Sequence, residues 1–109
     1  MSKLLASTLL ALCSVTHAEF VSGEHLYNAF NSTDPSERSV AAGYVVGVTD
    51  TVTGTHVCLP ASTAVKQVVG LVYQWLEHNP QYRHNSGDRV VVAVLAQAWP
   101  CVKGKQSDV

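Results

Sequence analysis

Two cysteines place the strongest constraint on how this chain can fold, because a bond between Cys58 and Cys101 would join positions that are 43 residues apart. The chain-entropy estimate for closing a loop of that length is about 4 kcal/mol at room temperature. The total stability of a small domain is only about 5–15 kcal/mol. A disulfide would therefore supply a large part of the stability of this chain, provided that the cysteines reach an oxidising compartment.

The first 18 residues have the pattern of a secretory signal peptide. Lys3 supplies a positive charge, residues 4–12 are apolar apart from Ser7 and Thr8, and residues 16–18 end in the small residues that a signal peptidase requires. The apolar run is shorter than the roughly 20 residues that cross a bilayer. We therefore expect residues 1–18 to be a cleaved signal peptide and residues 19–109 to form one exported domain, with no membrane contact after cleavage.

Removal of the signal peptide would take Cys13 with it. Residues 10–13 resemble a lipoprotein processing box, but Leu12 is larger than the residue that usually precedes the lipidated cysteine, so we favour a soluble exported form. The two cysteines that remain, Cys58 and Cys101, are predicted to form a disulfide. The alternative is a reactive thiol beside His56, which would need a correctly placed base and a third orienting group.

The charge of the exported part argues against nucleic acid as a partner. The exported part has eight acidic residues and, without Lys3, six basic ones. No cluster of basic residues is present to neutralise phosphates, so nucleic acid is not an expected partner.

Capping signals predict an all-α bundle of about four helices. Ser22 can cap a first helix that runs to about Asn31. Asp34 and Glu37 form a capping box around Pro35, in which Asp34 would accept from the amide of Glu37. This second helix is expected to reach Gly47. The sequence does not decide whether residues 48–57 are the end of this helix or a strand, because their β-branched residues favour strands.

The third and fourth helices follow from apolar periodicity and from proline. Ser62 or Thr63 can cap the third helix, whose apolar stripe runs from Val65 to Leu76 and ends before Pro80. Ser86 or Asp88 can cap the fourth helix. Residues 90–98 are apolar except Gln97, which predicts a central, buried helix that stops at residues 99–101, before a polar tail.

Residues that could perform catalysis do not form a recognisable motif. The four histidines of the exported part lack metal-binding spacing, and no Gly-x-Ser-x-Gly turn or phosphate-binding loop is present. We expect no catalytic residues, no metal, no cofactor and no enzymatic activity. Asp50 is interpreted as a helix-face group bonded to nearby threonines, or alternatively as half of a functional site.

Four consecutive residues in the connection between the third and fourth helices are candidates for binding a partner: Tyr82, Arg83, His84 and Asn85. Aromatic and guanidinium groups are enriched where proteins bind one another. A solvated loop without function is the alternative.

The order of motifs resembles the Rap/Tai immunity proteins of bacterial type VI secretion. The resemblance covers about Phe20 to Cys101 and rests on Phe20-x-x-Gly23-x-x-Leu26, Gly43-Tyr44-Val45-x-Gly47-Val48-x-Asp50, Cys58-Leu59-Pro60, Gln67, Leu76-Glu77-x-x-Pro80 and Ala96-x-Ala98-Trp99-Pro100-Cys101. Members of this family are small, mostly helical periplasmic proteins and are often dimeric. They bind peptidoglycan-cleaving amidase effectors and block the active site.

The resemblance has two structural implications. It extends helix across Gly43 to about Asp50, within the stretch that propensity leaves open. It also shows a departure, since Phe30 and Ala41 stand where the family usually has two further cysteines. Packing alone would then hold the first helix.

Two functions follow as hypotheses. The first is a periplasmic immunity protein that occludes a cognate amidase effector, as the resemblance implies; the alternative is a small periplasmic stress or chaperone-like protein without a toxin. A neighbouring effector gene would favour the first hypothesis, and a separate gene induced by envelope stress would favour the second.

For occlusion, residues 78–88 are the preferred contact segment and residues 53–61 the second choice. Replacing Tyr82 and Arg83 by alanine is expected to weaken binding and to leave the fold intact.

Overall fold

The computed structural model describes residues 20–102, so the predicted signal peptide and the end of the polar tail lie outside the described residues. Four α-helices follow one another along this part of the chain: α1 (Gly23–Phe30), α2 (Pro35–Val52), α3 (Val65–His78) and α4 (Gly87–Ala98), with a short 3₁₀ helix, η1 (Pro80–Tyr82), before the last. The described residues contain isolated bridges but no strand. The prediction of an all-α fold with about four helices is confirmed.

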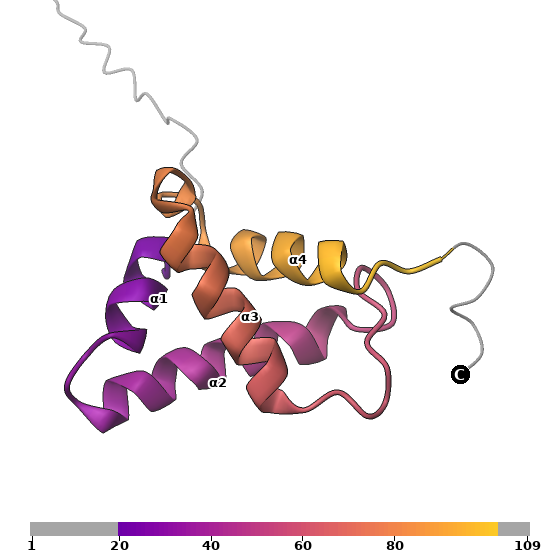
Figure 1. The fold of residues 1–109 in the computed structure, drawn as a ribbon, viewed down its shortest axis with the longest axis horizontal. Coiled ribbons are helices and arrows are strands. Elements are labelled where there is room, and N and C mark those ends of the chain that lie inside the picture. The colour runs from indigo at the N-terminus through magenta and orange to yellow at the C-terminus, as the bar shows by residue number, and fades with distance from the viewer. Residues whose placement is uncertain (1–19, 103–109) are drawn as a thin grey trace, which may run out of the picture.

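The helices surround one core. Each of the four packs against the other three, and α3 crosses in front of α2 in the view of Figure 1. The largest fully buried side chains of the core are Val45, Val57, Val72, Leu76, Val91 and Leu95. In the described part of the chain, no helix is long and apolar enough to span a membrane.

The first two helices begin at the predicted caps. The Ser22 hydroxyl accepts a hydrogen bond from the amide of His25 at 3.1 Å. At α2 the expected capping box is wrong in detail. The carboxylate of Asp34 accepts from the amide and the hydroxyl of Ser36, both at 2.9 Å, while the amide of Glu37 donates to the Asp34 carbonyl. The bonds from Ser36 hold the pKa of Asp34 below its ordinary value.

The end of α2 resolves the stretch that propensity left open. The helix continues to Val52, slightly beyond the end at about Asp50 that the family resemblance implies. Burial of Val45 and Thr49 outweighs the strand preference of the β-branched residues. The hydroxyl of Thr49 donates to the carbonyl of Val45 at 2.7 Å. After the helix, Gly54 turns the chain with φ +93°, a conformation that favours glycine.

Neither predicted cap begins α3. Its N-cap is Ala64, whose amide donates to the side-chain oxygen of Gln67 at 3.0 Å. The hydroxyl of Thr63 bonds instead to the carbonyl of Pro60 at 2.8 Å. A glutamine one turn inside the helix thus satisfies the terminus, which a search for capping hydroxyls does not detect.

The fourth helix is buried on one face only, so the prediction of a central, buried helix is wrong: Ala93, Gln97 and Ala98 are exposed. Its N-cap is Ser86, although the serine side chain makes no capping bond there. Four apolar side chains of α4 are buried: Val90, Val91, Val94 and Leu95.

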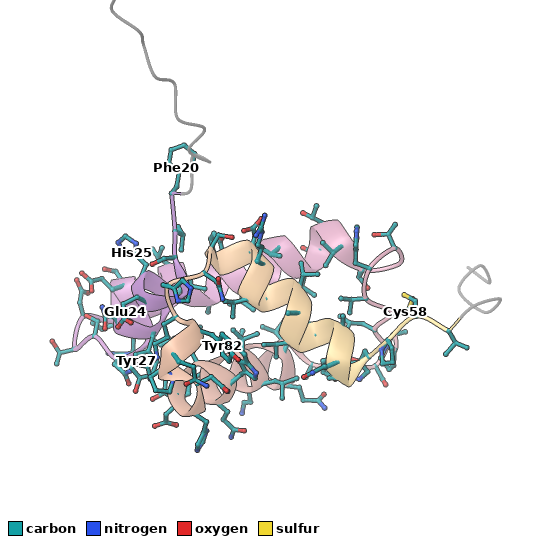
Figure 2. The ribbon with its side chains drawn as sticks, turned by 90° about the horizontal axis from the view of Figure 1, so that it is seen from above. Phe20, Glu24, His25, Tyr27, Cys58 and Tyr82 are labelled. Carbon is teal, nitrogen blue, oxygen red and sulfur yellow. A yellow bond between two sulfur atoms is a disulfide. The ribbon has the colours of Figure 1, made fainter. Side chains whose placement is uncertain are left out.

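The predicted disulfide between Cys58 and Cys101 is present, with 4.9 Å between the two Cα atoms. It joins the segment before α3 to the end of α4 (Figure 2). Beside it, the amide of Cys58 donates to the carbonyl of Trp99 at 2.9 Å. Because both sulfurs are in the bond, the alternative interpretation of Cys58 as a reactive thiol is wrong.

Candidate functional site

The connection between α3 and α4, residues 79–86, forms a compact turn. Its own backbone closes it, since the amide of Tyr82 donates to the carbonyl of Asn79 at 3.0 Å and the amide of Asn85 donates to the carbonyl of Tyr82 at 3.2 Å. The connection lies beside the start of α1, at the end of the molecule opposite the disulfide (Figure 1).

The start of α1 supports the connection through main-chain bonds. A helix leaves its first amides without partners inside the helix. Here the amide of Gly23 donates to the carbonyl of Asn85, and that of Glu24 donates to the carbonyl of Arg83, both at 2.8 Å. The amide of Gly87 donates back to the carbonyl of Val21 at 2.7 Å. These bonds fix α1 and the connection relative to each other.

The close approach requires glycine at position 23. A β-carbon built there would lie 2.9 Å from the carbonyl oxygen of Arg83 and 3.2 Å from the Cδ2 atom of Leu76. The first of these contacts is with backbone, which cannot rotate away. Gly23 therefore permits the contact between α1 and the connection.

Arg83 holds the connection from the side of α3. Its Nε donates to the carbonyl of Leu76 at 2.7 Å and its Nη2 to that of Glu77 at 3.2 Å. These acceptors belong to the last turn of α3, where carbonyls lack helical partners. The guanidinium carbon also lies 3.6 Å from the centroid of the Tyr27 ring, a cation–π contact with α1.

An aromatic cluster attaches α1 to α3. Tyr27 stacks on Tyr73 with ring centroids 5.9 Å apart, and Phe30 meets the same ring edge-on at 5.6 Å. The Tyr73 hydroxyl donates to the side-chain oxygen of Asn31 at 2.9 Å. Side-chain packing and hydrogen bonds thus hold α1 where other family members are expected to use a second disulfide.

The four predicted partner-binding residues occupy different environments. Tyr82 is 47% exposed and His84 is exposed, whereas Arg83 and Asn85 are half-buried. The Arg83 side chain is directed to α1 and α3. The expectation that both Tyr82 and Arg83 can be replaced without effect on the fold therefore needs correction, because Arg83 has three structural contacts.

Replacing Arg83 with alanine is expected to lower the free energy of unfolding by about 2 kcal/mol, because two charge-assisted hydrogen bonds and a cation–π contact are lost. Urea unfolding followed by circular dichroism would measure this change. The matched control is Arg89→Ala, since the exposed Arg89 side chain makes no hydrogen bond within the described residues; its effect should stay within about 0.5 kcal/mol. Equal unfolding midpoints for the two variants would show that Arg83 does not stabilise the connection.

A groove of about 310 Å³ borders the connection. It is lined by Trp75 of α3, by Tyr82 and Asn85 of the connection, and by Arg89, Val90 and Ala93 of α4. Sequence reasoning identified Tyr82 and Asn85 but missed Trp75 and Arg89. In the sequence, only the position of these two residues in the helical turns that flank the connection could have indicated them.

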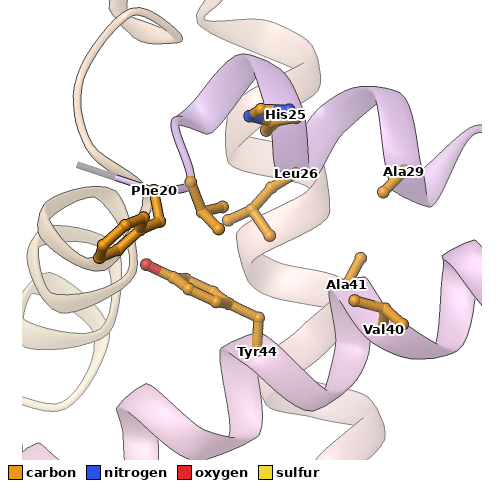
Figure 3. Close-up of a pocket in the computed structure, with 8 residues that line it drawn as sticks. Phe20, His25, Leu26, Ala29, Val40, Ala41 and Tyr44 are labelled. Carbon is orange, nitrogen blue, oxygen red and sulfur yellow. The ribbon is translucent and has the colours of Figure 1, made fainter. Parts of the chain in front are cut away.

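A second hollow, of about 130 Å³, lies between α1 and α2 (Figure 3). Ala29 and Ala41 line it, together with the exposed side chain of Val40. Ala41 stands at one of the positions where the resemblance leads one to expect a cysteine, and its short side chain leaves the space open. The hollow is mainly apolar, with His25 at its margin.

The second-choice contact segment lies at the disulfide end of the molecule. In residues 53–61, His56 is exposed while Val57 is fully buried. Asp50 is exposed on the preceding helix, and the neighbouring threonine hydroxyls bond to the carbonyls of Val45 and Gly47. The predicted bonding of Asp50 to threonines is therefore wrong.

Among residues 20–102, no group of three histidine, cysteine, aspartate or glutamate residues is placed to hold a metal ion.

The fold and the site define a small disulfide-linked helical protein that presents a braced connection at one end. A family model described as Rap1a immunity proteins matches residues 6–101, and the chain belongs to this family. Membership identifies it as an immunity protein against a secreted effector, and implies that it binds a cognate effector. A comparison with curated proteins finds no match.

Proposed function

We propose that the protein acts in the periplasm, after removal of residues 1–18, and that it neutralises a peptidoglycan-cleaving amidase effector of type VI secretion. It does so by binding over the amidase active site, without catalysis of its own. Family membership supports the role of immunity protein. The signal-peptide pattern and the resemblance to the Rap/Tai proteins support the compartment and the type of effector.

The observation that carries the occlusion mechanism is the bracing of the connection. Main-chain bonds from Gly23 and Glu24 hold it on one side, and the Arg83 side chain fixes it to α3 on the other. A segment that is ordered before binding loses less conformational entropy when it meets its partner. Such a segment can compete with substrate for a cleft.

Within the connection we assign two kinds of role. Tyr82 and His84 contact the effector directly, since they are the exposed members of the four predicted residues. Arg83 and Asn85 position them, because the carbonyls of both residues accept the bonds from α1. We further propose that the protein can form a homodimer, as the resemblance implies.

Replacing Tyr82 with alanine is expected to weaken effector binding by about 2 kcal/mol, which is roughly a 30-fold rise in Kd, because a large aromatic contact is removed. Calorimetric titration against each amidase effector encoded in the same genome would measure it. Tyr82→Phe keeps the ring and its stack on Trp75, so it serves as the conservative control. His56→Ala, in the second-choice segment, should leave the affinity unchanged.

Two outcomes would overturn parts of the proposal. If His56→Ala weakens binding and Tyr82→Ala does not, residues 53–61 make the contact. If no amidase from the same genome binds the wild-type protein, the immunity role against an amidase gives way to that of a periplasmic stress or chaperone-like protein.

A further inference from the structure

The groove beside the connection has an aromatic wall. The rings of Trp75 and Tyr82 stack with their centroids 5.9 Å apart and their planes inclined by 26°. Two residues of α4 also line the groove, the exposed Ala93 and the buried Val90. Trp75 is half-buried and Tyr82 is half-exposed, so the wall is anchored at its α3 side and open at its outer side.

Arg89 adds an uncompensated positive charge to this groove. Of the arginines and the lysine within residues 20–102, Arg38 and Arg83 bond to backbone carbonyls, whereas Lys66 and Arg89 have no side-chain partner. Only Arg89 among them lines the groove, which contains no acidic side chain. The neighbouring carboxylate of Asp88 accepts from the backbone amide of Arg89 at 2.9 Å, and within the described residues it forms no ion pair with the Arg89 guanidinium.

We propose that this groove binds a segment of a protein partner in which an aspartate or glutamate lies beside an apolar side chain. The acid would pair with the Arg89 guanidinium, and the apolar side chain would pack against Trp75, Tyr82 and Ala93. Tryptophan, tyrosine and arginine are the residues most enriched in the parts of interfaces that dominate binding energy. The inference rests on the proposed function, and it specifies the chemistry of the effector surface next to the connection.

A sugar is a less suitable occupant. Saccharides stack on open aromatic faces, whereas Trp75 and Tyr82 direct ring faces towards each other. A guanidinium without a partner is matched by a carboxylate, which accepts two parallel hydrogen bonds from it.

The first test is charge reversal at Arg89. We expect Arg89→Glu to raise the Kd for the effector that binds the wild-type protein at least about tenfold, because it places an acid against an acid. Lys66→Glu makes the same change in net charge at the start of α3 and should alter the Kd less than about twofold. Arg89→Lys, which keeps the charge, should recover part of the loss. If Arg89→Glu and Lys66→Glu have equal effects, the groove does not bind an acid.

A second test does not depend on the effector. The probes are the capped dipeptides acetyl-Leu-Glu-amide and acetyl-Leu-Gln-amide and the disaccharide chitobiose, each titrated at millimolar concentration against the exported protein. The indole N–H resonance of Trp75 should move with the glutamate dipeptide, and the shift should be absent in Arg89→Glu. A larger response to the glutamine dipeptide or to chitobiose overturns the inference. If no effector binds but the glutamate dipeptide does, the proposed function fails while the chemistry of the groove stands.

Discussion

Replacing both Cys58 and Cys101 by serine is expected to lower the free energy of unfolding by about 4 kcal/mol, because the unfolded chain gains the entropy that the 43-residue crosslink removes. Against a total of about 5–15 kcal/mol, this loss would leave the domain marginally stable. Guanidinium unfolding of the wild-type and double-variant proteins would measure it. The effect should be concentrated at the disulfide end, where the amide of Cys58 also bonds to the Trp99 carbonyl.

Reduction of the wild-type protein provides the control for this experiment. A reducing agent should shift the wild-type unfolding midpoint to that of the double variant and should not affect the double variant itself. If the oxidised and reduced wild-type proteins unfold at the same denaturant concentration, the crosslink does not contribute the expected stability.

Leu76→Ala is expected to destabilise the protein by about 3 kcal/mol, within the range of 2–5 kcal/mol measured for such truncations in packed cores. Leu76 is fully buried in α3, and its Cδ2 atom would lie 3.2 Å from a β-carbon at Gly23. The cavity would therefore open beneath the start of α1. Thermal and urea unfolding would both report the loss.

Val65→Ala is the matched control on the same helix. Val65 is 59% exposed, so its truncation should change the free energy of unfolding by no more than about 0.5 kcal/mol. Similar effects of the two variants would mean that the side of α3 facing α1 is not tightly packed.

The sequence predicted those parts of the fold that depend on neighbouring residues. Ser22 and Asp34 cap the first two helices with their own side chains, and the apolar stripe of α3 is visible as a period of three and four residues. The start of α3 was missed because a glutamine side chain, and not a hydroxyl, satisfies the first amide. The extent of α2 could not be read from propensity, because burial of Thr49 is a tertiary effect.

The candidate site was predictable only in its position along the chain. Exposed aromatic and charged residues between two helices indicated the connection. The role of Arg83 depends on Tyr27, which lies far away in the sequence and becomes a neighbour only when α1 packs on α3. In the same way, Arg89 became a candidate only when the structure placed it in a groove with Trp75.

The bracing of the connection has a consequence for how such proteins diversify. The bonds from α1 are received by main-chain carbonyls, which every amino acid possesses, so they place no demand on the side chains at positions 82 and 84. If Tyr82 and His84 contact the effector as we propose, substitutions at these positions would change which surface is recognised while the path of the backbone is retained. On this proposal, the main-chain bonds preserve the shape of the connection and the side chains at positions 82 and 84 select the target, so a few substitutions there would let the protein bind an effector whose surface has changed.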